Sequence, residues 1–365
     1  MNYANTSKYY NPAIYIWLLT ITAMVLLIIV IGGLTRLTDS GLSMTDWRPI
    51  LGVIPPLSLE SWLVVFEMYK QTPEYKIVNK NMTLNEFKYI FWWEWFHRIF
   101  ARAIGVVFLI PLIYFSFKKQ IQSSLYIRLG IVFVFGLFQA VIGWWMVKSG
   151  LTENPYVSPY RLTFHLLNAL IIFSILLWIA MDYRYSSNIS FLSNPKTIEF
   201  YILVAVILIF ITIATGGFMA GTNSGQSFNT FPLMNGKIIP DDYVIDDLGI
   251  YNIFENTVAI NFNHRWLSIF VFFYILFVCF KFIKFDNKNI SSTLVYLVLF
   301  FLTLQVILGI ITLLSNVYLP VASLHQTNSI LLLSTLLISY HQIKIRKVKN
   351  VYYTSDYVDW HSCRH

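Results

Sequence analysis

Hydrophobic residues fall into eight long runs along this chain of 365 residues, and polar segments separate the runs. A helix that crosses the roughly 30 Å of hydrocarbon in a bilayer needs about 20 mostly apolar residues. The runs cover approximately 13–33, 93–115, 126–147, 162–181, 200–220, 264–283, 292–314 and 321–340. The pattern therefore predicts an all-α polytopic membrane protein with eight transmembrane helices.

The composition supports this fold class. Hydrophobic residues make up 57% of the chain and charged residues only 12%, whereas a typical soluble protein carries about 25% charged residues. So few charges could not cover the surface of a soluble globule of this length. The net charge is +8, but the basic residues flank the apolar runs, so we expect no binding to nucleic acid.

The placement of Lys and Arg predicts the orientation in the membrane. The N-terminus, the connections after the second, fourth and sixth runs, and the C-terminal tail together carry 14 of these residues. The opposite connections carry nine, and seven of the nine lie in the long connections 34–92 and 221–263, where the bias counts less. We therefore predict that both termini are cytoplasmic. Residues 1–12 show no signal or transit peptide, which favours the bacterial inner (plasma) membrane.

Four motifs occur twice, in the same order and at similar offsets of 184, 167, 166 and 160 residues. Gly32-Gly33, with the Thr-x-Ser-Gly-x-Ser at 38–43, returns at 216–227, and His97-Arg98 returns as His264-Arg265. Gln139-x3-Gly143 returns as Gln305-x3-Gly309, and His165-x2-Asn168 returns as His325-x2-Asn328. The repeat predicts two four-helix bundles in parallel, related by an axis along the membrane normal.

The repeat also predicts the domain organisation. We expect a cytoplasmic N-terminus at 1–12, a cytoplasmic linker at 182–199 and a cytoplasmic tail at 341–365. The first bundle should cover 13–181 with the outer loop 34–92, and the second should cover 200–340 with the outer loop 221–263.

Four of the seven histidines belong to the repeat: His97, His165, His264 and His325. Each lies near the start of an even-numbered run, so all four are expected at a similar depth near the outer surface. One pair in each bundle could clamp a planar metallomacrocycle from both faces. A single histidine there could instead be an interfacial residue, and zinc requires three or four ligands together. Two pairs without nearby cysteine fit haem better.

The remaining histidines and the cysteines point to no further site. His341 is expected on the cytoplasmic side in a structural role, and His361 and His365 in the solvated tail. Cys279 lies inside an apolar run and Cys363 lies in the tail, so neither a disulfide framework nor a CxxCH haem attachment is possible.

Arg98 and Arg265 each follow the first histidine of a bundle. A guanidinium at the outer edge could pair with a haem propionate, or it could snorkel to the membrane interface. The sequence leaves both roles open.

The two halves differ beside the first histidine. Glu94 precedes His97 by three residues, a spacing that places both on one helix face, whereas Asn261 stands at that position before His264. Arg36 likewise corresponds to Ala220. The difference predicts proton-coupled chemistry in the first bundle and a permanently held redox group in the second. A simple interfacial or helix N-terminal charge is the alternative for Glu94.

These motifs together resemble haem A synthase, the haem O-oxidising family of bacteria and mitochondria. The resemblance runs from about residue 13 to 340 and leaves the tail 345–365 without an account. It is carried by residues 32–44, Trp47-Arg48-Pro49, Glu94-x2-His97-Arg98, His165-x2-Asn168, 255–265 and His325-Gln326-x-Asn328. The first outer loop has no cysteine pair, which is similar to the proteobacterial and mitochondrial branch.

The resemblance implies a function and a set of site residues. His264 and His325 would be the axial ligands of a haem b iron, with Arg265 also at that cofactor. His97 and His165 would serve the haem O site, as tentative ligands of the substrate iron, and Glu94 would be essential for catalysis. The C8 methyl group of haem O would be hydroxylated twice, and the resulting geminal diol would lose water to give the formyl group of haem A for terminal oxidases.

The resemblance also implies partners. Haem O carries a farnesyl tail, so it should enter sideways from the lipid bilayer. Expected partners are the haem O synthase, a protohaem farnesyltransferase, and an electron donor such as a ferredoxin; a homo-oligomer is compatible with the sequence. Two other function classes are a di-haem b-type electron carrier and a transporter. The first predicts equivalent sites, and the second predicts charged residues in mid-membrane.

Overall fold

The structure, a computed structural model, describes residues 10–46, 51–152, 154–185, 196–285 and 292–356. Within these residues, eight helices are long and apolar enough to cross a membrane, which confirms the predicted fold class. They are α1 (Pro12–Leu37), α4 (Leu84–Phe117), α5 (Ser123–Gly150), α6 (Pro159–Tyr185), α7 (Lys196–Gly221), α9 (Thr257–Phe285), α10 (Ser292–Leu314) and α11 (Leu319–Asp356).

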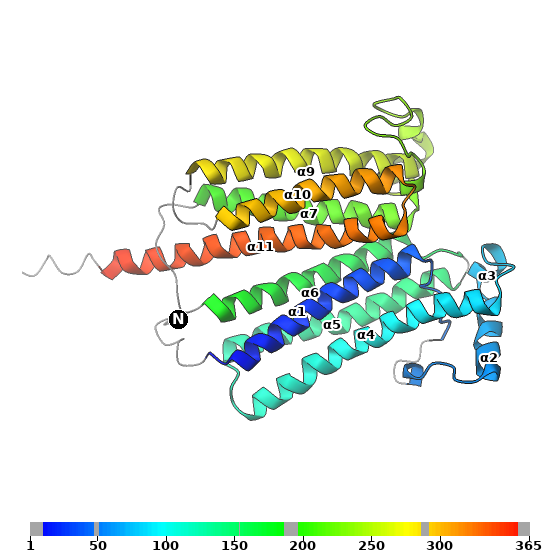
Figure 1. The fold of residues 1–365 in the computed structure, drawn as a ribbon, viewed down its shortest axis with the longest axis horizontal. Coiled ribbons are helices and arrows are strands. Elements are labelled where there is room, and N and C mark those ends of the chain that lie inside the picture. Colours follow the sequence, from blue (N-terminus) through cyan, green and yellow to red (C-terminus); the bar gives the residue numbers. More distant parts are fainter. Residues whose placement is uncertain (1–9, 47–50, 153, 186–195, 286–291, 357–365) are drawn as a thin grey trace, which may run out of the picture.

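Shorter elements lie in the two long connections. The first connection contains η2 (Leu51–Val53), α2 (Leu59–Lys70) and α3 (Pro73–Ile77), and the second contains η3 (Ser224–Gln226), η4 (Asp241–Tyr243), η5 (Asp246–Tyr251) and α8 (Asn252–Glu255). Both connections lie at the same end of the long helices, opposite the N-terminus (Figure 1).

The long helices form two groups of four with the same neighbour relations. In the first group α1 packs against α4 and α6, and α6 packs against α5; in the second, α7 packs against α9 and α11, and α11 packs against α10. The groups meet where α6 contacts α7 and α11 and where α1 contacts α11. We interpret this arrangement as the two bundles of the sequence repeat.

One helix pair differs between the groups. In the second group, α9 and α10 pack closely against each other. The equivalent helices α4 and α5, both fully described, have no comparable backbone packing. Bulky side chains bridge them, and the rings of Phe108 and Phe133 stack with centroids 6.3 Å apart. The backbones of the first bundle are therefore farther apart on the α4–α5 side, with aromatic side chains between them.

The helix α4 begins nine residues before the predicted apolar run. Thr83 caps it: the Thr83 hydroxyl accepts from the Glu86 backbone N–H, and the Glu86 carboxylate accepts from the Thr83 backbone N–H at 2.7 Å. This capping box stabilises helical turns that are too polar for the apolar pattern to include. His97 consequently lies more than three turns inside its helix, although it is near the outer end of the apolar span.

A small aromatic core fixes α2 and α3 of the first connection onto α4. The buried residues are Trp62, Phe66, Tyr69, Phe87, Ile90 and Phe91. Glu74 of α3 is buried beside them and accepts a hydrogen bond from the Tyr69 hydroxyl at 2.9 Å. Burial raises the pKa of Glu74 to about 7, against the lowering effect of this hydrogen bond.

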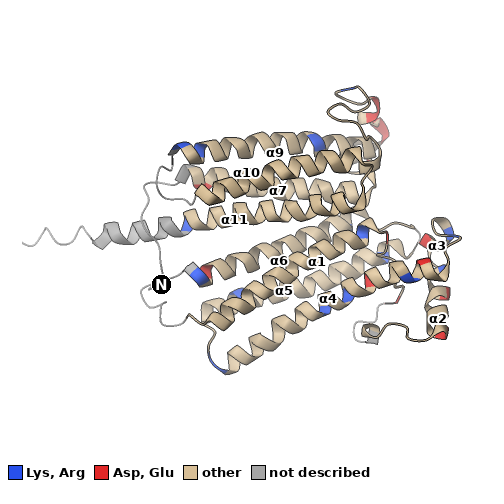
Figure 2. Cartoon of the chain, in the orientation of Figure 1, with Lys and Arg blue, Asp and Glu red and all other residues tan. Residues whose placement is uncertain are grey.

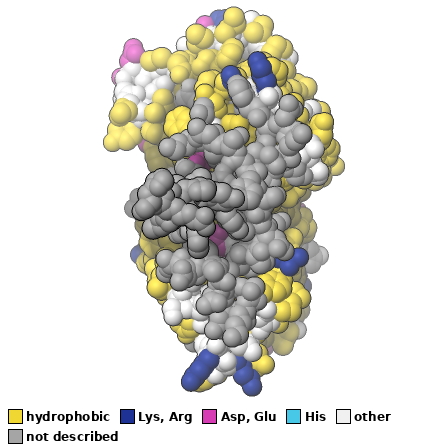
Figure 3. Space-filling view, turned by 90° about the vertical axis from the view of Figure 1, so that its left-hand side faces the viewer, with side chains coloured by type: hydrophobic (Ala, Val, Ile, Leu, Met, Phe, Trp, Pro, Cys, Tyr) yellow, Lys and Arg dark blue, Asp and Glu magenta, His cyan; other side chains and the backbone are white. Residues whose placement is uncertain are grey.

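Charges are concentrated at the helix ends. Figure 2 shows that most Asp and Glu lie at the end formed by α2, α3 and residues 222–256, and that the long central stretches of the helices are almost uncharged. Figure 3 looks onto the opposite end and shows hydrophobic side chains around its periphery, with Lys and Arg among them. This distribution fits a bundle whose flanks face lipid.

His341 has a structural environment at the N-terminal end of the bundles. Its ring is fully buried, lies 2.7 Å from Asp182 and packs edge-on against Trp178. Asp182 also pairs with Arg128, so three helices are tied together. His361, His365, Cys363 and the motif Trp47-Arg48-Pro49 lie outside the described residues.

Candidate functional site: a histidine pair in each bundle

Each of the four repeat histidines packs against a glycine of a neighbouring helix. A Cβ atom on Gly32 would lie 3.5 Å from His97, on Gly143 3.0 Å from His165, on Gly216 3.4 Å from His264 and on Gly309 2.9 Å from His325. These glycines are the ones that the sequence repeat pairs, Gly32 with Gly216 and Gly143 with Gly309. At Gly143 and Gly309 an added Cβ would crowd the imidazole, whereas at Gly32 and Gly216 it would make ordinary van der Waals contact.

The second histidine of each pair has the same amide neighbours. Gln139 Nε2 lies 3.2 Å from His165 Nε2, and the Gln139 carbonyl accepts from Asn168 at 2.6 Å. In the other bundle, Gln305 Nε2 lies 3.3 Å from His325 Nδ1, and its carbonyl accepts from Asn328 at 2.8 Å. The Gln-x3-Gly and His-x2-Asn motifs thus build one local unit, used twice.

The two histidines of each predicted pair lie in the same group of four helices, His97 on α4 with His165 on α6, and His264 on α9 with His325 on α11. His165 lies within electrostatic range of His97, and His264 lies within range of His325. All four rings are half-buried. Nδ1 of His165 is a buried nitrogen with no hydrogen-bond partner in the described part of the chain. Such rings are available as ligands.

The donor set fits haem better than a free metal ion. Among the described residues, no group of three or more His, Cys, Asp or Glu is placed to hold a metal ion. Two imidazoles from facing helices supply the two axial ligands that a haem iron takes, because the porphyrin supplies the other four. Both pairs therefore fit a haem, one in each bundle.

Glu94 is buried and held firmly beside the first pair. Its side chain is 2% exposed. One carboxylate oxygen accepts from the Ser43 hydroxyl at 2.7 Å and from the Met44 backbone N–H at 2.8 Å, and the other accepts from Arg98 at 2.5 Å. These contacts fix the orientation of the only buried acid on the described part of this helix.

Asn261 occupies the matching position beside the second pair and is fully buried. Its amide donates to the Ser224 carbonyl at 2.7 Å, and its oxygen accepts from Arg265 at 2.6 Å. The local frame is conserved between the halves while the ionisable group is not, which is the difference that the sequence predicts.

Arg98 and Arg265 each anchor one of the two long connections, the one after α1 and the one after α7. Arg98 donates to the Met44 carbonyl at 3.1 Å, and Arg265 donates to the Thr230 carbonyl at 2.7 Å and to the Phe228 carbonyl. A guanidinium carries five N–H donors, so Arg265 has donors beyond those used in these bonds. Its contact with a haem propionate stays a prediction.

Two residues, Arg102 and Thr215, and one contact made by Arg36 were not found by the sequence analysis. Arg102 lies one turn below Arg98 within the apolar part of α4, where a charge is costly and the second half has Ile269. Thr215 on α7 contacts His264 at 2.8 Å. Arg36 reaches across the bundle boundary and donates to the carbonyl of Ala220, its own repeat counterpart, at 2.7 Å. An Arg inside an apolar run was a signal for the first; the other two required the tertiary structure.

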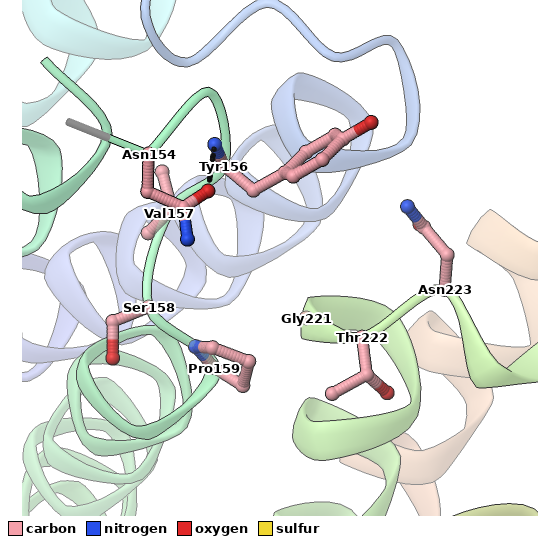
Figure 4. Close-up of a pocket in the computed structure, with 8 residues that line it drawn as sticks. All are labelled: Asn154, Tyr156, Val157, Ser158, Pro159, Gly221, Thr222 and Asn223. Atoms are coloured by element: carbon pink, nitrogen blue, oxygen red, sulfur yellow. Dashed lines mark hydrogen bonds between the residues drawn. The ribbon is translucent and has the colours of Figure 1, made fainter. Parts of the chain in front are cut away.

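A separate pocket of about 400 Å³ lies at the outer end, between residues 154–159 and the end of α7 (Figure 4). In it, the Asn154 side chain accepts from the Tyr156 backbone N–H at 2.9 Å. None of the four paired histidines lines this pocket. It is distinct from the histidine sites and is lined by loop residues at the boundary between the bundles.

Eight membrane-crossing helices with a half-buried pair of histidines in each half define a polytopic membrane protein whose donor set suits haem. The chain matches the COX15-CtaA family model, described as cytochrome oxidase assembly protein, over residues 15–337, and it belongs to this family.

The relatives carry a more specific name. Haem A synthase from Nitrosomonas eutropha is 42% identical over 327 residues, which is 89% of this chain and 92% of that protein. Haem A synthase from Nitrosospira multiformis is 40% identical over 332 residues, covering 91% and 93%. Haem A synthase from Wolbachia pipientis of Culex pipiens is 42% identical over 317 residues, covering 87% and 93%.

Proposed function

We propose that this protein is a haem A synthase, a membrane oxidoreductase that converts a methyl group of haem O to the formyl group of haem A. One observation carries the proposal most directly: two matched histidine pairs share one scaffold, and a buried acid stands beside only one of them. The names of the relatives support the same reaction. A di-haem electron carrier would need no such difference.

His264 and His325 would hold haem b, the cofactor. Held by two imidazoles, this group would supply one-electron transfer. The chain contributes an amide, Asn261, where the first bundle has an acid, and it anchors the loop 221–256 through Arg265.

His97 and His165 would hold the substrate haem O, with Glu94 as the proton acceptor. In the net half-reaction, a methyl group and one water give a formyl group, four protons and four electrons, and an oxidant such as dioxygen must take up the electrons. The site must therefore remove protons as well as electrons. Glu94 is the buried carboxylate on the same helix face as His97, and its three donors keep it oriented while it accepts a proton.

Haem O would enter the first bundle from the lipid, between α4 and α5. Its farnesyl tail disfavours a path through water. In the second bundle the equivalent helices α9 and α10 are packed together, whereas α4 and α5 are held apart by side chains such as Phe108 and Phe133. This difference suits a cofactor that stays in one half and a substrate that is exchanged in the other.

The protein would lie in the bacterial inner membrane with both termini in the cytoplasm. The support is the basic side chains at the N-terminal end of the helices and the acidic connections at the other end (Figure 2). Haem O synthase, an electron donor such as a ferredoxin, and further copies of the chain are the expected partners.

Conversion of haem O by Glu94→Gln tests this function. The variant should retain the haem b spectrum of the purified protein but lower the yield of haem A at least about 100-fold, since proton acceptance contributes roughly two to four orders of magnitude. The control is Glu60→Gln on the exposed start of α2, which should convert haem O normally. Extracted pigments are identified by mass. A normal haem A yield from Glu94→Gln would contradict the proton role.

A further inference from the structure

The imidazole of His264 is oriented by one hydroxyl group. Thr215 Oγ1, on the facing helix α7, lies 2.8 Å from His264 Nδ1. The same hydroxyl donates its only hydrogen to the Thr212 carbonyl, also at 2.8 Å. With its hydrogen on that carbonyl, the hydroxyl accepts from the ring, and we assign the proton of His264 to Nδ1 on this geometry. This leaves the Nε2 lone pair of a neutral imidazole free to bind a metal.

The first bundle lacks this contact. Gly32 corresponds to Gly216, so the repeat places Ile31 at the position of Thr215. An isoleucine side chain cannot accept a hydrogen bond, and in the described part of the chain no hydrogen bond reaches the His97 ring. Both rings lie against their glycine, since a Cβ on Gly32 would be 3.5 Å from His97 Nε2 and a Cβ on Gly216 would be 3.4 Å from His264 Cε1. His97 and His264, the first histidine of each pair, thus differ by one hydroxyl acceptor.

We propose that Thr215 is a positioning residue that makes the haem of the second bundle a fixed cofactor, while Ile31 leaves His97 a weaker, exchangeable ligand suited to a substrate. This inference rests on the proposed function. An acceptor at Nδ1–H fixes the ring orientation and increases the electron donation of Nε2, and loss of such partners typically weakens metal binding about 10- to 100-fold. The enzyme must retain one haem and release the other, so this asymmetry serves its turnover.

The first arm of the test compares three variants on α7. Thr215→Val removes the hydroxyl, Thr215→Ser keeps it, and the control Thr212→Val removes a hydroxyl that bonds the Leu208 carbonyl one turn away. Purified protein is mixed with excess apomyoglobin, and the transfer of haem b is followed by absorbance. A redox titration gives the reduction potential.

We expect Thr215→Val to lose haem b about 10- to 100-fold faster than the wild type. Its reduction potential should rise, because weaker donation from the imidazole destabilises the ferric iron. Thr215→Ser and Thr212→Val should match the wild type in both measurements. Equal exchange rates and potentials in Thr215→Val and Thr212→Val would overturn the proposal, and so would a Thr215→Ser variant as impaired as Thr215→Val.

The second arm reverses the difference. Ile31→Thr should slow the release of haem from the first bundle and leave the haem b potential unchanged. This variant tests the proposal even if Thr215→Val does not fold. Unchanged release would overturn the proposal. His264→Ala separates the two levels of inference: if it still binds haem b, the proposed cofactor site is wrong, whereas haem loss there with a normal Thr215→Val removes only the role of Thr215.

Discussion

The two halves of this protein share a scaffold and differ at a few positions that decide what each half can do. In both, a histidine lies against a glycine of the facing helix and its partner lies beside a glutamine. In the first half Glu94 is a buried acid and Ile31 leaves His97 without an acceptor; in the second, Asn261 is neutral and Thr215 holds His264. Under the proposed function, these single side chains would distinguish a substrate site from a cofactor site.

Linking α4 to α5, compared with linking α9 to α10, gives the largest expected difference in haem O conversion. Phe108→Cys with Phe133→Cys, bridged by a short bismaleimide, should fix α4 to α5 and reduce haem O conversion at least about tenfold by blocking entry. The matched control bridges Ile275→Cys to Leu299→Cys, the equivalent positions of α9 and α10, and should leave conversion unchanged. Equal conversion in the bridged and unbridged α4–α5 variant would exclude this route.

Substitutions of the glycines that contact the histidines should affect the two sites separately, and their effects should be smaller. In Gly309→Ala the new Cβ would lie 2.9 Å from the His325 ring, so haem b occupancy should fall about tenfold. Gly143→Ala places a Cβ 3.0 Å from His165 and should lower haem O conversion to a similar extent while haem b remains. Pyridine haemochrome analysis and pigment extraction measure the two quantities. Haem b loss in Gly143→Ala would show that the sites are not independent.

The outer segments differ in their response to pH, which is the smallest expected effect. The raised pKa of Glu74, about 7, means that its protonated form stabilises the packing of α3. This contribution is fully present below about pH 4.5 and is lost as pH rises through 7. Hydrogen exchange in residues 59–77, corrected for intrinsic rates, should therefore accelerate about tenfold between pH 5 and 8.

Glu74→Gln should abolish that acceleration. The long connection of the second half has buried amides, Asn252 and Asn256, and no buried acid among its described residues, so it should show no such change. If residues 59–77 exchange at the same corrected rate at both pH values in the wild type, burial does not raise the pKa of Glu74.

The sequence predicted most of this architecture because its main signals are strong. Eight apolar runs determine eight membrane-crossing helices, and ordered repeats single out the histidines. The start of α4 was wrong by nine residues, because Thr83 and Glu86 cap polar turns outside the apolar run. Thr215 and the histidine–glycine contacts could not be predicted, since they depend on which helices face each other.

The haem content of four alanine variants tests the central claim, that the halves hold different haems, most directly. Purified His264→Ala and His325→Ala should lose the low-spin haem b signal in absorbance and electron paramagnetic resonance spectra. His97→Ala and His165→Ala should keep that signal, yet fail to bind or convert added haem O. The account is contradicted if haem b is lost from the His97 and His165 variants and retained in the other two.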